Sequence, residues 1–258
     1  MGNPVVYFEV GAADARLLVA FYGELFGWEL RGSSSGTYTM IDTRGGDGVN
    51  GGIATSRSGE SWSTFYAETD DLQATLDRAN ALGGVTVMPI TPTGGTAMAM
   101  FSDPDGLRVG LVRAPAGPAP GNHAAPSTGS GEPVTWFEIL GPDAARTQRF
   151  YADLFGWSTD LGIPGYAVTN TGAGRGIHGG IGGGVEPFGT IVYVGVPDVD
   201  ETLGRAEKLG GSRVLAPGLS ALKNEARAAL YGSADDIDTG WFRDPAGNVF
   251  GVFHKQAR

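Results

Sequence analysis

Two glutamates in matching sequence surroundings are the first candidates for chemistry. Glu9 lies in the segment VVYFEVG and Glu138 in VTWFEIL. Residues two apart on a β-strand share a face, so Tyr7 and Trp136 are expected beside these carboxylates. A carboxylate that apolar neighbours partly shield from water can act as a general base. The alternative is that each glutamate accepts hydrogen bonds from backbone or an Arg and only fixes the sheet.

A third candidate for catalysis is His178, in the segment GIHGGI; the similar segment GVNGGI holds Asn50 at the same place. Glycines around a strand residue let a ligand approach the backbone closely. A histidine there can exchange a proton near neutral pH, and it would complement Glu138. The competing interpretation is a histidine that is hydrogen-bonded for purely structural reasons.

Aromatic residues on strands and turns are candidates for binding a planar organic molecule, because ligand sites are mostly apolar with a few polar groups. Strand aromatics also build cores, so both roles stay open. The candidate binding residues are Tyr7, Tyr38, Asn50, Phe101, Trp136, Tyr166 and Trp241.

Composition excludes several functional classes for this sequence. The 258 residues include no Cys and three His, which removes disulfides, Cys zinc sites and thiol nucleophiles. The formal net charge of −10 comes without a basic cluster, so no nucleic-acid or membrane partner is expected. No apolar run of membrane-spanning length and no signal-like N-terminus is evident, which predicts a cytoplasmic protein.

The elements that must position these residues occur twice, because the chain is an internal duplication. The segment 4–28 aligns without a gap to 133–157, and both end in LFGW. The match continues through GGI, LGG and the DPDG and DPAG turns. We therefore predict a first repeat over 1–113, a Pro/Gly/Ser/Ala-rich linker over 114–132 and a second repeat over 133–258.

Within each repeat the hydrophobic pattern predicts a strand, a helix and three strands, and then the same order again. In the first repeat the strands are expected at 4–10, 28–31, 37–42, 49–55, 63–69, 85–88, 97–102 and 107–113, and the second helix at 71–82. Asp14 is placed to begin the first helix and Gly27 to end it. The predicted fold class is α+β, with four βαβββ modules in curled mixed sheets around clefts.

This organisation resembles the vicinal-oxygen-chelate superfamily, which includes glyoxalase I, bleomycin- and fosfomycin-resistance proteins and extradiol dioxygenases. The motifs that carry the resemblance are the LFGW helix ending, GGI, LGG and DPxG. The resemblance implies that curled strands of paired modules enclose a ligand cleft. It also implies a divalent metal in many relatives, held by ligands on the first, fifth and last strands.

The metal ligands that the resemblance implies are mostly missing from this chain. Relatives with a metal carry a carboxylate where this chain has Gly110 and Gly251, and their fifth-strand ligand aligns with Thr64 and Ile191. Only the first-strand glutamates remain, and one carboxylate per repeat does not make a chelate. We expect no cofactor, and a divalent metal is disfavoured.

Three functions compete at this point. The first is a metal-independent isomerase-like or lyase-like enzyme, or a tailoring enzyme of specialised metabolism, that acts on a small organic molecule. The second is a resistance-type protein that sequesters a hydrophobic drug or metabolite. The third, a metal-dependent glyoxalase-type lyase or dioxygenase, is disfavoured by the two glycines.

The second repeat is predicted to carry the site, because it holds His178, Trp136 and an insertion at 219–236. That insertion suits a lid, a surface decoration or an interface equally well. Four modules in one chain predict a monomer or a weak homodimer.

Overall fold

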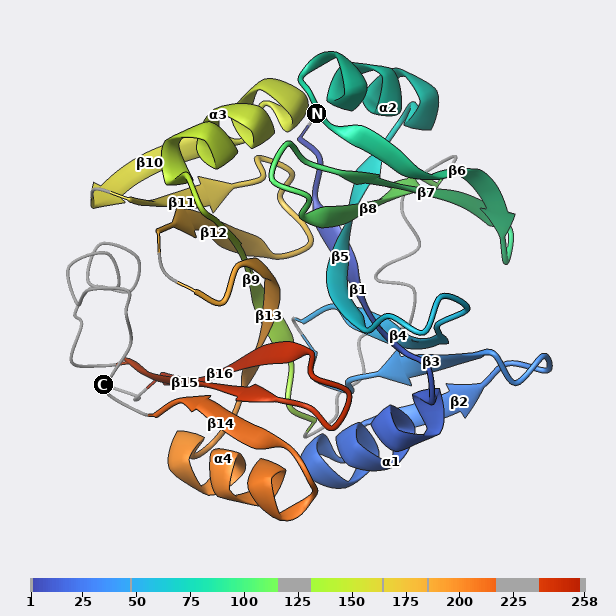
Figure 1. Ribbon diagram of the computed structural model, residues 1–258, viewed down its shortest axis with the longest axis vertical. Helices are drawn as coiled ribbons and strands as arrows, with labels where there is room; N and C mark the ends of the chain where they lie inside the picture. The colour runs from blue at the N-terminus through green and yellow to red at the C-terminus, as the bar shows by residue number, and fades with distance from the viewer. Residues whose placement is uncertain are drawn as a thin grey trace. The chain divides into compact units, whose positions relative to one another are not determined.

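The computed structural model describes residues 2–46, 48–115, 131–163, 165–184, 186–216 and 237–255. Its fold is α+β with four βαβββ modules, as predicted (Figure 1). Most of the linker and the insertion at 219–236 lie outside the described residues. Among the helices described, none is long and apolar enough to span a membrane.

The described residues of each repeat form one eight-stranded mixed sheet. The first has the order β2-β3-β4-β1-β5-β8-β7-β6, and the second the order β10-β11-β12-β9-β13-β16-β15-β14. The strands of the first sheet are β1 (Val5–Ala12), β2 (Glu29–Gly32), β3 (Tyr38–Asp42), β4 (Asn50–Thr55), β5 (Trp62–Thr69), β6 (Val85–Thr93), β7 (Thr96–Ser102) and β8 (Arg108–Arg113). Those of the second are β9 (Val134–Gly141), β10 (Ser158–Ile163), β11 (Tyr166–Asn170), β12 (His178–Gly183), β13 (Gly189–Gly195), β14 (Ser212–Leu215), β15 (Ile237–Arg243) and β16 (Val249–Lys255).

Strand β6 is longer than the sequence pattern indicates. It runs through Pro89 and Pro92 to Thr93, whereas the apolar alternation predicted a strand over 85–88. The strand lies at the end of the sheet order, next to β7 only. A proline without an N–H is tolerated on an edge strand, so two prolines do not end this one.

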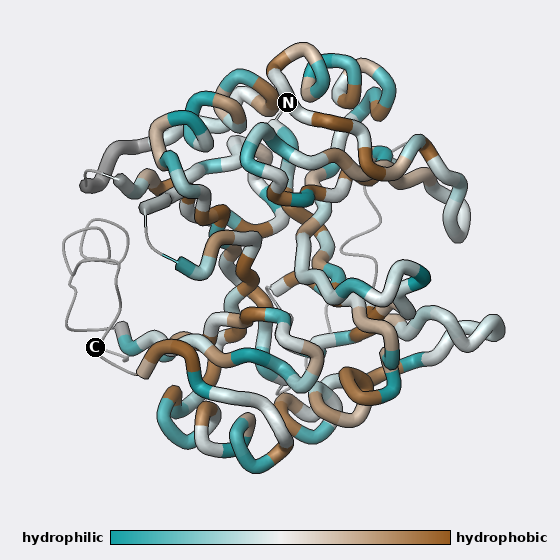
Figure 2. The backbone as a smooth tube through the Cα atoms, viewed as in Figure 1, coloured by the Kyte–Doolittle hydropathy of each residue, from teal (hydrophilic) through white to brown (hydrophobic). Residues whose placement is uncertain are grey.

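Each of the four helices in the described part of the chain follows an aspartate cap, as was predicted for Asp14. The helices are α1 (Ala15–Phe26), α2 (Leu72–Ala81), α3 (Ala144–Phe155) and α4 (Val199–Lys208). Each preceding Asp side chain accepts a backbone N–H of the first turn. Gly27 and Gly156 then end α1 and α3 in the left-handed conformation that glycine favours. Hydrophobic and hydrophilic segments alternate along the helices, as expected where one face packs on a sheet (Figure 2).

The chain divides into two compact units that each combine both repeats. Unit A comprises Met1–Tyr7, Thr64–Asn122 and Trp136–Thr190; unit B comprises Phe8–Ser63, His123–Thr135 and Ile191–Arg258. Each sheet is therefore built from the strands of one repeat, whereas each compact unit contains modules from both repeats.

The aromatic cores of both units join the two repeats. In unit A the rings of Phe65 and Phe137 lie 4.5 Å apart and those of Phe101 and Phe150 lie 6.0 Å apart. In unit B the ring of Phe8 lies 6.3 Å from that of Phe250. Helices α2 and α3 are neighbours in unit A, and α1 and α4 are neighbours in unit B (Figure 1).

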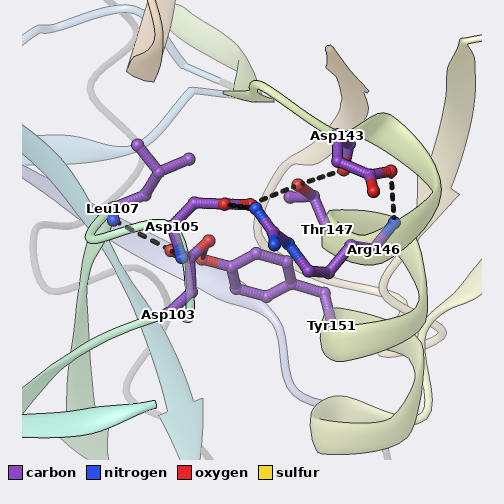
Figure 3. Close-up of polar contacts among 7 residues, drawn as sticks. All are labelled: Asp103, Asp105, Leu107, Asp143, Arg146, Thr147 and Tyr151. Atoms are coloured by element: carbon purple, nitrogen blue, oxygen red, sulfur yellow. Dashed lines mark hydrogen bonds and ion pairs between the residues drawn. The ribbon is translucent and has the colours of Figure 1, made fainter. Parts of the chain in front are cut away.

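Two sequence motifs meet in a buried hydrogen bond within each unit. In unit A, Tyr151 of α3 donates to Asp103 Oδ2 in the DPDG turn at 3.2 Å, and Asp103 Oδ1 accepts the backbone N–H groups of Asp105 and Leu107 (Figure 3). In unit B, Tyr22 of α1 donates to Asp244 Oδ2 at 2.9 Å. Each bond joins a helix of one repeat to a turn of the other. Together they explain why both motifs occur in both repeats.

Candidate functional site

Glu138 lies on β9 with its carboxylate almost fully removed from solvent. Its residue is 2% exposed, and Tyr166 on β11 donates its hydroxyl hydrogen to Glu138 Oε1 at 2.8 Å. Strand β12 runs parallel to β9, with Gly180 opposite Glu138 and His178 opposite Trp136. Residues opposite each other on paired strands share a face, so Glu138, Trp136 and His178 share one face of the second sheet. The structure therefore places three predicted site residues on one face of the sheet.

Glycines on β12 make room for Tyr166 on that face. A methyl group at Gly180 would overlap the Tyr166 hydroxyl, and one at Gly182 would lie 2.6 Å from the ring. The first GGI motif provides the same space, because a methyl group at Gly52 would overlap Tyr38. The motif thus has a packing reason in both repeats.

His178 and Asn50 make the same contact in the two repeats. His178 is exposed, and its Nδ1 accepts the backbone N–H of Thr171 at 3.4 Å. Asn50 Oδ1 accepts the backbone N–H of Thr43 at 3.0 Å. Thr43 and Thr171 are matching positions of the duplication. Both side chains therefore brace the loop that precedes their strand, and a proton-transfer role for His178 stays a proposal.

Glu9 lies in a different setting from Glu138. It is 7% exposed on β1, and Trp62 Nε1 donates to its Oε1 at 3.3 Å. A side chain at Gly11 would overlap the Trp62 ring, so this glycine gives the indole its place. At the position that matches Trp62, the second repeat has Gly189. The indole contact is therefore particular to the first repeat.

An apolar cluster on the first sheet, within unit A, contains residues that the sequence analysis did not single out. Tyr66, Met100 and Val112 are buried there, and Val6, Tyr7, Met88 and Met98 pack against them partly exposed. The rings of Tyr7 and Tyr66 meet edge to face with centroids 6.1 Å apart. We call this set the methionine–tyrosine surface. A signal was available, because Met98 and Met100 are two residues apart on one strand and therefore share a sheet face.

Phe101, Trp241 and Tyr38 are the other predicted binding residues. Phe101 is fully buried against Phe155 of α3, so it belongs to the core of unit A. Trp241 is also buried, and its Nε1 donates to the Tyr193 hydroxyl at 2.6 Å. Tyr38 is partly exposed on β3.

The residues present do not fit the family's metal site. Gly110 lies opposite Tyr66 on β5, and Gly251 lies opposite Tyr193 on β13. Any side chain at either glycine would overlap the tyrosine ring. The aromatic rings thus fill the place of the last-strand carboxylate. Among the described residues no three His, Cys, Asp or Glu side chains cluster as metal ligands.

Comparison with known proteins places this fold. Residues 5–111 match the family described as "Glyoxalase/Bleomycin resistance protein/Dioxygenase superfamily". The Mn(II)-bound glyoxalase from Novosphingobium aromaticivorans superposes with a TM-score of 0.64 at 17% identity, covering 99% of this chain and 83% of the glyoxalase. A likeness at this level of identity shows the fold alone.

Two of the relatives align with most of the chain. The anthracycline biosynthesis protein DnrV of Streptomyces peucetius is 28% identical over 231 residues, covering 80% of this chain and 82% of DnrV. CFP32 of Mycobacterium bovis is 27% identical over 254 residues, covering 87% of this chain and 92% of CFP32.

Proposed function

We propose that this chain, which belongs to the glyoxalase/bleomycin resistance protein/dioxygenase superfamily, is an enzyme that tailors a small specialised metabolite without a resident metal. Glu138 is the general base of this proposal. The reaction class is an isomerase-like or lyase-like step. The observation that carries the proposal is the buried Glu138 carboxylate, held by Tyr166 on the same sheet face as Trp136.

The chemistry follows from a single carboxylate that can exchange a proton. Glu138 takes a proton from a carbon next to a carbonyl group, and the electron pair moves into an enolate. Returning the proton at another atom gives an isomer, and expelling a leaving group gives the lyase outcome. His178, on the same face, is the proposed partner that returns the proton. Glu9 would serve a second site in the first repeat.

The substrate class rests on the relatives and on the aromatic residues. A relative that covers 80% of this chain is named for anthracycline biosynthesis. We therefore propose a planar polycyclic aromatic substrate. Trp136 and Tyr7 are the aromatic side chains expected to stack on it.

The experiment starts from the molecule that the protein itself retains. Mass spectrometry of denatured wild-type protein identifies the co-purifying compound, and wild type and Glu138→Gln are then incubated with it. We expect the variant to bind the compound but to convert it about 100-fold more slowly, the usual worth of a general base. Conversion at the wild-type rate would overturn the assignment of Glu138. Glu9→Gln, the matched change in the first repeat, tests the second site, and we expect it to slow conversion much less than Glu138→Gln does.

The methionine–tyrosine surface favours a second function, which is sequestration of a hydrophobic molecule without turnover. Methionine side chains adapt to irregular ligands, and they make favourable contacts with aromatic rings. Met88 and Met98 are partly exposed there. If this function holds, wild type returns the captured compound unchanged and Met98→Ala weakens its binding, whereas Glu138→Gln alters neither.

A further inference from the structure

We propose that Tyr166 is a positioning residue for Glu138: its hydroxyl fixes the orientation of the carboxylate and sets how strongly that carboxylate holds a proton. This inference deepens the proposed function and rests on it for its catalytic meaning. The contact itself can be tested without any substrate.

The Tyr166 and Glu138 side chains form a buried hydrogen bond of normal length. The Tyr166 hydroxyl lies 2.8 Å from Glu138 Oε1, and the two residues are 3% and 2% exposed. A hydrogen bond to an ionised acceptor is stronger than one between neutral groups, and burial strengthens it further. An O–H donor favours the ionised form of the carboxylate that accepts it.

The backbone is arranged to hold this tyrosine in place. Tyr166 lies opposite Gly182 on the antiparallel pair of β11 and β12, and Val168 lies opposite Gly180. The hydroxyl passes over Gly180, where any side chain would overlap it. Gly180 in turn lies opposite Glu138 on β9. The missing side chain at Gly180 therefore opens the path along which Tyr166 reaches across β12 to Glu138.

The corresponding carboxylate of the first repeat has an additional and different donor. Trp62 Nε1 donates to Glu9 Oε1, and an indole N–H neither ionises nor accepts a hydrogen bond. A phenol does both, so it can follow a change in the charge of its partner.

Other titratable groups near Glu138 must be included in the test. Of the described residues, β9, β11 and β12 carry Glu138, Tyr166 and His178 as their titratable side chains, and β13, the next strand to β9 in the sheet order, carries Tyr193. His178 has its Nδ1 directed to Thr171, 3.4 Å away. A measurement specific to Glu138 is therefore required.

The experiment titrates Glu138 itself. Protein labelled with ¹³C at the glutamate carboxyl carbon is followed by NMR against pH, and the Glu138 signal is identified by its loss in Glu138→Gln. In Tyr166→Phe we expect the pKa of Glu138 to rise by about one unit, as loss of one hydrogen bond to a charged group predicts. An unchanged titration of Glu138 would overturn the proposal.

Two further variants keep the test decisive if Tyr166→Phe does not fold. Gly180→Ala displaces the hydroxyl, so the same upward shift is expected, whereas the matched change Gly52→Ala in the first repeat leaves the Glu138 titration unchanged. Site-specific 3-fluorotyrosine at position 166 retains the ring and makes the hydroxyl a stronger donor. It is expected to lower the pKa of Glu138, and a shift in the other direction contradicts the proposal.

The proposal and the proposed function fail in different ways. If Tyr166→Phe shifts the Glu138 titration but Glu138→Gln converts the co-purified compound at the wild-type rate, the positioning contact stands and the proposed function falls. If Glu138→Gln abolishes conversion but Tyr166→Phe leaves the titration unchanged, the positioning role falls alone.

Discussion

Four buried carboxylates, those of Glu9, Glu138, Asp103 and Asp244, lie in two kinds of surroundings, and their hydrogen-bond partners separate the two. Glu9 and Glu138 project from first strands of modules, where glycines on the neighbouring backbone admit an aromatic donor. Asp103 and Asp244 lie in turns, where backbone N–H groups and a tyrosine of the other repeat surround them. The turn aspartates have enough donors to serve stability alone.

The hydrogen bond between Tyr151 and Asp103 predicts a pH-dependent loss of stability. Burial raises the pKa of Asp103 to about 6, and the tyrosine opposes this rise. A folded-state pKa above the unfolded value means that the Asp103 contribution is fully present below about pH 4 and is lost as the pH rises through about 6. In Tyr151→Phe the charged form loses a donor, so we expect a loss of about 1–2 kcal/mol at pH 7 and less at pH 4.5.

Urea unfolding at both pH values measures this effect. Tyr22→Phe removes the matching bond to Asp244, whose pKa is also raised by burial, and should behave alike. Equal losses at the two pH values would contradict the prediction.

Glu132, immediately before the second repeat, also predicts that the protein loses stability as the pH rises. Its Oε2 is buried without a hydrogen-bond partner among the described residues, and burial raises its pKa to about 7, with the charge of Arg205 opposing. The folded protein holds this proton more tightly, so stability falls as the pH rises from about 4.5 to about 7.

Glu132→Gln removes that ionisation. We expect the free energy of unfolding of the variant to exceed that of wild type by about 1 kcal/mol at pH 8, where Glu132 is ionised, and by little at pH 4, where it is protonated. The gain is small because water screens the partly exposed carboxylate. Thermal unfolding across this range provides the measurement. A parallel decline of both proteins with pH would refute the assignment.

On the adjacent strands β5 and β8, the Tyr66 ring fills the space where a side chain at Gly110 would lie. This packing predicts that a carboxylate introduced at Gly110 destabilises the protein. Gly110→Glu brings back the carboxylate of metal-dependent relatives, but its side chain meets the Tyr66 ring. We expect a loss of about 1–3 kcal/mol in unfolding free energy from overpacking. The same substitution should add no tightly bound divalent metal, as measured by elemental analysis after dialysis.

A glycine with open surroundings is the control for that experiment. Gly204 lies within α4, where a methyl group would meet nothing within 4 Å. Gly204→Ala is expected to stabilise the protein by roughly 0.5–1 kcal/mol, because alanine favours a helix interior. An unchanged free energy of unfolding in Gly110→Glu would contradict the prediction, because it would mean that the Tyr66 ring moves aside at little cost.

For the chain as a whole, the division into units A and B predicts that the repeats stay together after the chain is cut. Each unit contains strands from both repeats, and their aromatic cores join Phe65 to Phe137 and Phe8 to Phe250. A protease site inserted between residues 118 and 128 and then cleaved should leave one species in size-exclusion chromatography. Separate elution of the two fragments without denaturant would contradict the observed pairing. The oligomeric state, predicted as monomer or weak homodimer, can be read from the same experiment.

The amino-acid sequence by itself determined the duplication, the four modules, the helix caps and the absence of a last-strand carboxylate. These features follow from local periodicity and residue type, which a linear pattern carries directly. The length of β6 was missed, because proline is read as a strand end unless the strand is known to lie at an edge.

Only the tertiary structure decided which side chains meet. Tyr166 lies 28 residues from Glu138 and Tyr22 lies 222 residues from Asp244, and no local pattern encodes such pairings. His178 differs from Asn50 in type, yet both accept the N–H of a matching threonine, because the loop geometry requires an acceptor there. The physical reason is that the order of the strands and the space above the backbone select which side chains meet. Gly180 leaves room for the Tyr166 hydroxyl, whereas the Tyr66 ring fills the space above Gly110.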